Sequence, residues 1–150
     1  MPIGQSQPVI VVFALAMQSL IAVPEPVRKE LDAMCAGWQL ASVLPEIAEE
    51  IQTRTPAWPP NLLPGDFNGD ADIDVAVLVE CRGSVQLVAF LSRGSGFAKD
   101  VLEKPESHDP RQFLHLIRKE YGHDAIGVEY EAVGGHAWVF RDGRWRSLPR

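Results

Sequence analysis

The chain of 150 residues contains only two cysteines, Cys35 and Cys81, and no CxxC pair. This spacing gives no support for a structural zinc site or for thioredoxin-like redox chemistry. In an exported protein, a disulfide between them would close a long loop and stabilise the fold by about 3–4 kcal/mol. In a cytosolic protein both would be small buried side chains. The sequence leaves these two alternatives open.

Positive charge is also scarce, because 14 Lys and Arg stand against 20 Asp and Glu, a formal net charge of −6. Broad binding to a nucleic-acid backbone needs clustered positive charge, so we do not expect a nucleic-acid partner. The 12 glycines and 12 prolines are too few for a low-complexity chain, and the hydrophobic content of 46% is that of a globular protein. The length fits one folded domain.

No charged side chain occurs before Glu25, and residues 9–17 form a continuous apolar run. This run is too short for a transmembrane helix and is typical of the hydrophobic region of an export signal. The lack of Lys and Arg at the start leaves a second interpretation, an N-terminal core strand of a cytoplasmic protein. We predict a signal peptide at 1–22 and a single domain at 23–150, secreted or periplasmic.

Proline is unevenly distributed, since none falls between Gly65 and Lys104. Proline cannot donate to a β-ladder, so a sheet is expected in this window and helices, turns and extended connectors before it. A helix is predicted between Pro24 and Gly37, where one apolar stripe recurs at helical spacing. A shorter helix is predicted from Pro45.

The hydrophobic period changes to two beyond residue 72. Apolar, β-branched segments at 73–79, 85–91 and 97–102 are joined by short glycine turns, which predicts an antiparallel meander. Further strands are predicted at 113–119, 125–133 and 136–140, and a hairpin turn at Asp142-Gly143 would bring Phe140 opposite Trp145. The predicted fold class is α+β, with one or two N-terminal helices packed on an antiparallel β-meander of about five to seven strands.

Residues 65–75 read Gly-Asp-Phe-Asn-Gly-Asp-Ala-Asp-Ile-Asp-Val. Oxygen-bearing side chains occupy alternate positions: Asp66, Asn68, Asp70, Asp72 and Asp74. Two carboxylates about 4 Å apart repel by roughly 1 kcal/mol in water and about 4 kcal/mol at an effective dielectric of 20, and a divalent cation removes this cost. Calcium, with about six to eight oxygen ligands, suits a turning loop better than magnesium. The alternative is a solvated hairpin turn at Asn68-Gly69.

The loop departs from the EF-hand pattern, because Ala71 stands at the turn glycine and Val77 at the closing Glu. It resembles the calcium loop of the FG-GAP (VCBS) repeat, which reads roughly G-D-x-N-G-D-G-x-x-D before an apolar strand. The resemblance implies side-chain ligands from Asp66, Asn68, Asp70 and Asp74 and a backbone carbonyl ligand from Asp72.

Ala71 also departs from the FG-GAP repeat, where a glycine tolerates a left-handed turn; an alanine in that conformation costs on the order of 1 kcal/mol. The motif occurs once, and a propeller needs at least about four blades, so the resemblance covers the loop and the strand after it only. The whole chain is also similar to small bacterial proteins that carry one such motif after a helix and a Gly-Trp segment, here residues 37–41.

Three functional hypotheses follow. The first is a small exported module that binds calcium in the 65–75 loop, with a mainly structural ion and another face for a protein or small ligand. The second is a metal-assisted hydrolase that uses the same loop, which requires an open coordination position beside a polar cleft. The third is a periplasmic inhibitor or interaction protein that acts through the C-terminal hairpin. None of the four histidines has metal-ligand spacing, and we predict no catalytic residue.

The C-terminal hairpin combines arginines with aromatic residues. These are Arg141, Arg144, Arg146 and Arg150 with Trp138, Phe140 and Trp145. Arginine and tryptophan dominate interface hot spots, which favours a binding surface. The alternative is a terminal hairpin that turns its aromatic side chains to the core while its arginines protect a sheet edge.

Overall fold

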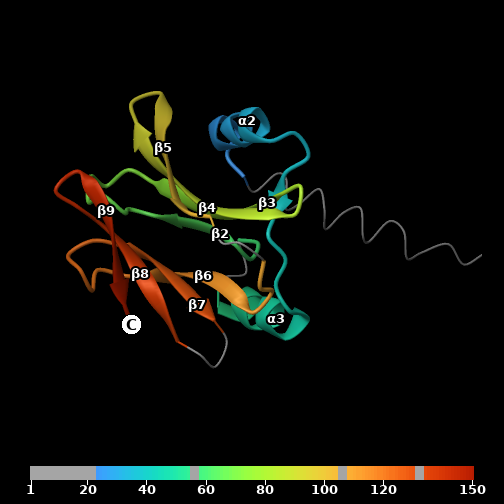
Figure 1. The fold of residues 1–150 in the computed structure, drawn as a ribbon. Coiled ribbons are helices and arrows are strands. Elements are labelled where there is room, and N and C mark those ends of the chain that lie inside the picture. Colours follow the sequence, from blue (N-terminus) through green and yellow to red (C-terminus); the bar gives the residue numbers. More distant parts are fainter. Residues whose placement is uncertain (1–22, 55–57, 105–107, 131–133) are drawn as a thin grey trace, which may run out of the picture.

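The computed structural model describes residues 23–54, 58–104, 108–130 and 134–150 (Figure 1). The signal peptide predicted at 1–22 lies outside these residues, as does the end of the strand predicted at 125–133. In the described part of the chain, no helix is long and apolar enough to cross a membrane.

In the part of the chain that the structure describes, two helices precede the long strands. Helix α2 (Glu25–Met34) begins after Pro24, and Pro26 lies in its first turn, where a missing N–H breaks no helical bond. Its buried residues Val27 and Leu31 lie one turn apart on a single face. Helix α3 (Pro45–Arg54) begins at a proline and buries Ile47. Both predicted helices are confirmed.

The larger sheet, called sheet A, has five antiparallel strands. They are β1 (Gln39–Leu40), β2 (Leu62–Gly65), β3 (Asp74–Cys81), β4 (Ser84–Arg93) and β5 (Gly96–Glu103). Strands β3, β4 and β5 form the predicted meander with short turns. Strands β1 and β2 pair with the same strand, β1 with residues 79–80 and β2 with residues 74–77 of β3.

The prediction of helices, turns and connectors alone before residue 65 is wrong at β1 and β2. Pro64 lies within β2 and pairs with Val75. Strand β2 pairs only with β3, so a residue without an N–H can point its nitrogen away from the ladder. A proline-rich segment therefore forms part of the sheet edge that leads into the acidic loop.

The smaller sheet, called sheet B, has four antiparallel strands in the order β6-β7-β8-β9. They are β6 (Gln112–Ile117), β7 (Ala125–Tyr130), β8 (Gly134–Arg141) and β9 (Arg144–Pro149). Phe140 pairs with Trp145 across the turn at Asp142-Gly143, as predicted. The prediction of one meander of about five to seven strands is corrected, because the described residues form two sheets of five and four strands.

The main core lies between the two sheets. Leu78 and Leu87 of sheet A and Leu114 and Ile126 of sheet B belong to one buried cluster. A second cluster joins α2 to the other face of sheet A, so this sheet is covered on both sides (Figure 1). The described residues are mostly β with two helices, broadly α+β, and their two sheets do not close into a propeller.

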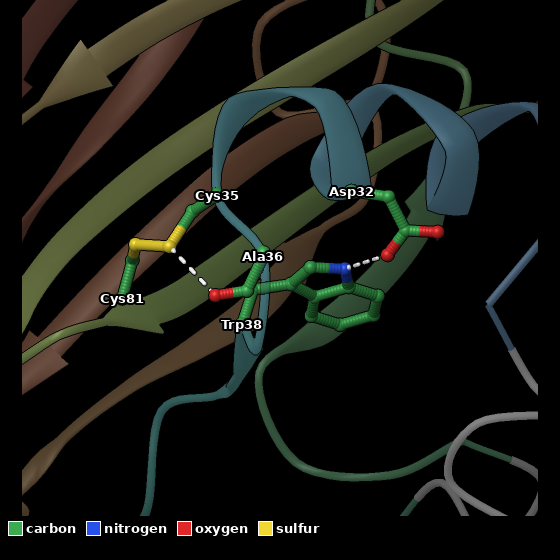
Figure 2. Close-up of a disulfide and its surroundings, with 5 residues drawn as sticks. All are labelled: Asp32, Cys35, Ala36, Trp38 and Cys81. Atoms are coloured by element: carbon green, nitrogen blue, oxygen red, sulfur yellow. Dashed lines mark hydrogen bonds between the residues drawn. A yellow bond between two sulfur atoms is a disulfide. The ribbon is translucent and has the colours of Figure 1, made fainter.

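A disulfide joins Cys35, directly after α2, to Cys81 at the end of β3, with Cα atoms 6.2 Å apart. Figure 2 shows Trp38 beside it, donating its indole N–H to Asp32 at 2.7 Å. The sequence left open whether the two cysteines form a disulfide or are separate buried thiols, and in the structure they form the disulfide. It ties the C-terminal end of α2 to sheet A.

Candidate metal loop

The acidic loop, residues 66–73, joins β2 to β3 and is closed by the pairing of Gly65 with Asp74. The loop is longer than a two-residue turn at Asn68-Gly69, because the strand pairing ends at Gly65 and Asp74. Its flanking strands still form an antiparallel hairpin, as the alternative of a solvated hairpin turn requires. Phe67 is fully buried in the main core, with its ring centroid 6.2 Å from that of Trp145. One apolar side chain therefore anchors an otherwise polar loop.

The carboxylate of Asp66 organises the turn. Its Oδ1 accepts from the backbone N–H groups of Gly69 at 2.9 Å and Asp70 at 3.1 Å, and its Oδ2 accepts from that of Ala71 at 3.0 Å. Ala71 has φ 71°, in the left-handed region. The loop therefore adopts at Ala71 the conformation that a glycine tolerates better, at a cost on the order of 1 kcal/mol.

Asn68 and Asp70 lie side by side. The Asn68 amide group donates to Asp70 Oδ2 at 3.0 Å, while Asn68 Oδ1 accepts from the backbone N–H of Asp70 at 3.2 Å. Asp70 Oδ1 accepts from the backbone N–H of Asp72 at 2.9 Å. Asp70, Asp72 and the neighbouring Ile73 are exposed, so this end of the loop faces solvent.

Asp74 is the buried acid of the group, with no exposed surface. Its Oδ2 accepts from the backbone N–H of Phe67 and its Oδ1 from that of Ser92, both at 2.8 Å. Burial raises the pKa of this carboxyl, the two amide bonds oppose the rise, and the charge of Asp70 adds to it. Asp74 therefore connects the start of the loop to β4 and is a carboxylate in a desolvated position.

The structure adds three residues that the sequence did not connect with the loop, Lys119, His123 and Asp124. Asp124 Oδ2 accepts from the backbone N–H of Asp66 at 3.1 Å, and the Asp124 N–H donates to the Asp66 carbonyl oxygen at 3.2 Å. His123 lies against Gly69 and, with Lys119, lines a hollow of about 150 Å³ beside Asp66. The acidic loop and this segment are 58 residues apart in the chain, so no local spacing indicates the contact.

The predicted ligand residues are only partly assembled. Among the residues that the structure describes, no three Asp, Glu, His or Cys side chains come together in a group that could hold a metal ion. The side chains of Asp66 and Asp74 bind backbone amides. Asp66 Oδ2 and both Asp74 oxygens accept one N–H each and keep a second lone pair for a cation, whereas Asp66 Oδ1 already accepts two N–H groups. The donor set, all oxygen, fits calcium better than a softer metal.

Other polar clusters lie apart from the loop. The His136 and Trp138 side chains of β8 both bond to Glu103 of β5 and so join the two sheets. Ser42 Oγ lies 3.3 Å from His108 Nε2, but this nitrogen is 2.7 Å from the Ser42 carbonyl oxygen. A carbonyl oxygen only accepts, so Nε2 carries the proton and is not a base for the Ser42 hydroxyl.

The C-terminal hairpin turns its aromatic side chains inward. Trp138, Phe140 and Trp145 pack against the main core, whereas the four arginines of the hairpin are exposed. The second of the two sequence interpretations describes this arrangement. An interaction surface on this hairpin would offer guanidinium groups rather than exposed aromatic rings.

Comparison of the chain with protein-family models, with curated proteins and with solved structures finds no match. The interpretation of the loop therefore depends on its own residues and contacts. The most informative of these contacts involve Asp66, which shapes the turn, and Asp74, which is buried at its base.

Proposed function

We propose that the protein is a small exported module whose 65–75 loop binds one calcium ion with a mainly structural role. The observation that carries this proposal is the fully buried carboxylate of Asp74, placed close enough to Asp70 for their charges to interact. A buried charge destabilises a fold unless it is paired or coordinated, and like charges add to the cost. A cation at the loop would relieve both effects.

The proposed ligands are the side chains of Asp66, Asn68, Asp70 and Asp74 and the backbone carbonyl of Asp72. When bound, calcium would supply positive charge to these oxygen atoms with flexible coordination geometry. Asp66 supports the proposal because it already holds the turn through three backbone amides. The side chain of Asp70 would have to turn toward Asp66 and Asp74 on binding, since these acids do not form a preformed group in the described residues.

Export is part of the proposal. The charge-free apolar start of the chain is its first support. The Cys35–Cys81 disulfide is the second, because such bonds form and persist in oxidising compartments such as the periplasm or the extracellular space. Sequencing the N-terminus of protein purified from its source tests this part; a mature chain that starts at Met1 would overturn it.

Calcium binding is tested by isothermal titration and by thermal unfolding with calcium or with EDTA. At a calcium concentration 100 times the Kd, binding stabilises the fold by about 2.7 kcal/mol, which corresponds to a rise in Tm of about 5–11 °C for a chain of this size. We expect this rise in the wild type and its loss in Asp70→Asn.

The matched control is Asp142→Asn, which removes an exposed carboxylate in the β8–β9 turn and should keep the full calcium response. Asp72→Asn should weaken binding only modestly, because its proposed contact is through the backbone. A wild-type protein that gives no heat with calcium and no change in Tm would overturn the proposal.

A second candidate, metal-assisted hydrolysis, is favoured by the hollow beside Asp66. His123 Nδ1 lies 2.9 Å from the Asp124 carbonyl oxygen and so carries the proton, which leaves Nε2 able to accept one. Calcium-dependent cleavage of p-nitrophenyl phosphate or p-nitrophenyl acetate that disappears in His123→Gln would support this function. If the calcium-loaded wild type shows no turnover, hydrolysis is excluded for these substrates and the structural role of the ion is the proposal that remains.

A further inference from the structure

A cavity of about 290 Å³ is lined by residues of α3, β2 and β6, and none of its described lining residues belongs to the acidic loop. Its apolar lining includes Ile51 of α3, Leu62 and Leu63 of β2, and Leu114 and Leu116 of β6. Sites for small molecules are typically mostly apolar cavities of about 300–1,000 Å³ with a few polar groups. This cavity is just below that range, so it suits a small organic molecule.

Asn61 is engaged through both ends of its side-chain amide, and His115 is engaged through Nε2, whereas His115 Nδ1 is buried without a hydrogen-bond partner among the described residues. The Asn61 side-chain amide donates to the Ala41 carbonyl oxygen at 2.7 Å, and its oxygen accepts from the Leu114 N–H at 3.2 Å. His115 Nε2 lies 3.3 Å from a carboxylate oxygen of Glu129 and 3.3 Å from a guanidinium nitrogen of Arg150. Neither residue is the main candidate for recognising a ligand.

The remaining polar residues of the lining are Arg54 and Arg118, and both are cationic. Arg54 pairs with Glu50 one helical turn away, and both side chains are more than half exposed, so this pair contributes little stability. For Arg118, no ion-pair partner is found within the described ranges. No carboxylate is among the described lining residues.

The charges around the cavity are of both signs, because the Glu129 carboxylate lies beside His115 and Glu50 pairs with Arg54. Burial lowers the pKa of His115, Glu129 opposes this, and the positive charges of Arg150 and Arg54 lower it further. The ring of His115 also packs on Gly127, where an added Cβ would lie 1.9 Å from His115 Cε1. The cavity therefore combines an apolar lining, a wall residue held in place by close packing, and two guanidinium groups.

We propose that this cavity binds a small organic carboxylate, with the carboxylate held by Arg54 and Arg118 and the apolar body held against Ile51 and the leucines of β2 and β6. A planar guanidinium matches a carboxylate through two parallel hydrogen bonds, and a charged bond of this kind is stronger than a neutral one. The apolar side chains of the walls would contact the apolar part of the ligand, and the cavity volume of about 290 Å³ limits the size of that ligand.

The test uses 3-phenylpropionate and its neutral amide, 3-phenylpropionamide, as probes of equal size. Binding is measured by NMR titration of the ¹⁵N-labelled full-length protein, with the backbone amides of Leu114 and Leu116 as reporters. We expect the carboxylate to bind at least about tenfold more tightly than the amide. Arg54→Gln and Arg118→Gln should each remove most of this difference and leave the affinity for the amide unchanged.

Arg144→Gln is the matched control, because Arg144 is exposed on β9 and does not line the cavity. Circular dichroism and Tm verify that each variant is folded. Equal binding of the acid and the amide, an unchanged acid affinity in both cavity variants, or an equal loss in Arg144→Gln would overturn the proposal. The protein is first freed of calcium with EDTA, and the EDTA, itself a carboxylate, is then removed by dialysis into metal-free buffer. The outcome of the titration is therefore independent of calcium binding at the 65–75 loop.

Discussion

Replacing Cys35 and Cys81 by alanine removes the only disulfide that this chain can form. The bond joins residues separated by 46 positions, and the segment between them contains α3 and most of β3. The bridge restricts the unfolded chain by holding the ends of this segment together. Helix α2 also contacts sheet A through Val27 and Leu31, which are buried in the second cluster.

The chain-entropy relation gives about 4 kcal/mol for a loop of 46 residues. Native domains are stable by about 5–15 kcal/mol, so the double variant should lose a large share of its free energy of unfolding and remain folded at low temperature. With a denaturant slope of about 4 kcal/mol/M, the midpoint in guanidinium chloride should fall by about 1 M.

The assay compares the oxidised wild type, each single alanine variant, the double variant and the reduced wild type. Either single substitution breaks the bridge, so all four altered proteins should lose nearly the same free energy. A loss below about 1 kcal/mol would refute the entropic reasoning. Additive losses from the two single variants would show that each cysteine contributes by packing, independently of the bond.

Three further predictions concern single residues. Ala71→Gly should stabilise the protein by about 1 kcal/mol in thermal unfolding, because Ala71 has φ 71°; a loss of stability would contradict this. Asn61→Ala should lower the free energy of unfolding, measured with denaturant, by about 2–4 kcal/mol, because the Leu114 N–H and the Ala41 carbonyl lose the buried Asn61 side chain as their partner. An unchanged midpoint would mean that water replaces the Asn61 side chain. Burial lowers the pKa of His115 in the folded protein, so as the pH falls the unfolded chain binds a proton at this residue before the folded protein does. The free energy of unfolding should therefore decrease between about pH 6.5 and the folded-state pKa. The decrease should be at most about 1.4 kcal/mol per pH unit. Urea midpoints between pH 7 and pH 5 should show a flatter dependence in His115→Gln than in the wild type.

Local patterns were sufficient for much of the secondary structure. Glycine turns between β-branched runs predicted the β3–β4–β5 meander, and Asp142-Gly143 predicted the pairing of Phe140 with Trp145. These features depend on neighbours in the chain, because a tight turn sets the register of the strands that flank it. The apolar positions Val27 and Leu31 of α2 were likewise predictable, because helical spacing depends only on residues a few positions apart in the chain.

Strand β2 and the division into two sheets were not predictable in this way. The segment around Pro64 has a poor composition for a strand and forms one because it pairs with β3 on one side only. The separation of sheet A from sheet B depends on which apolar faces meet in the main core, which no short segment specifies.

For the acidic loop, the sequence by itself determined the alternating oxygen-bearing side chains and the strand that follows them, since spacing along the chain is sufficient for both. Only the tertiary structure decided that Asp74 is buried, that Asp70 and Asp72 are exposed, and that Asp124 bonds to the Asp66 backbone. The physical reason is that burial and contacts over 58 residues arise from the packing of sheets A and B. The pairing of Cys35 with Cys81 was decided in the same way, because it requires α2 to lie on sheet A.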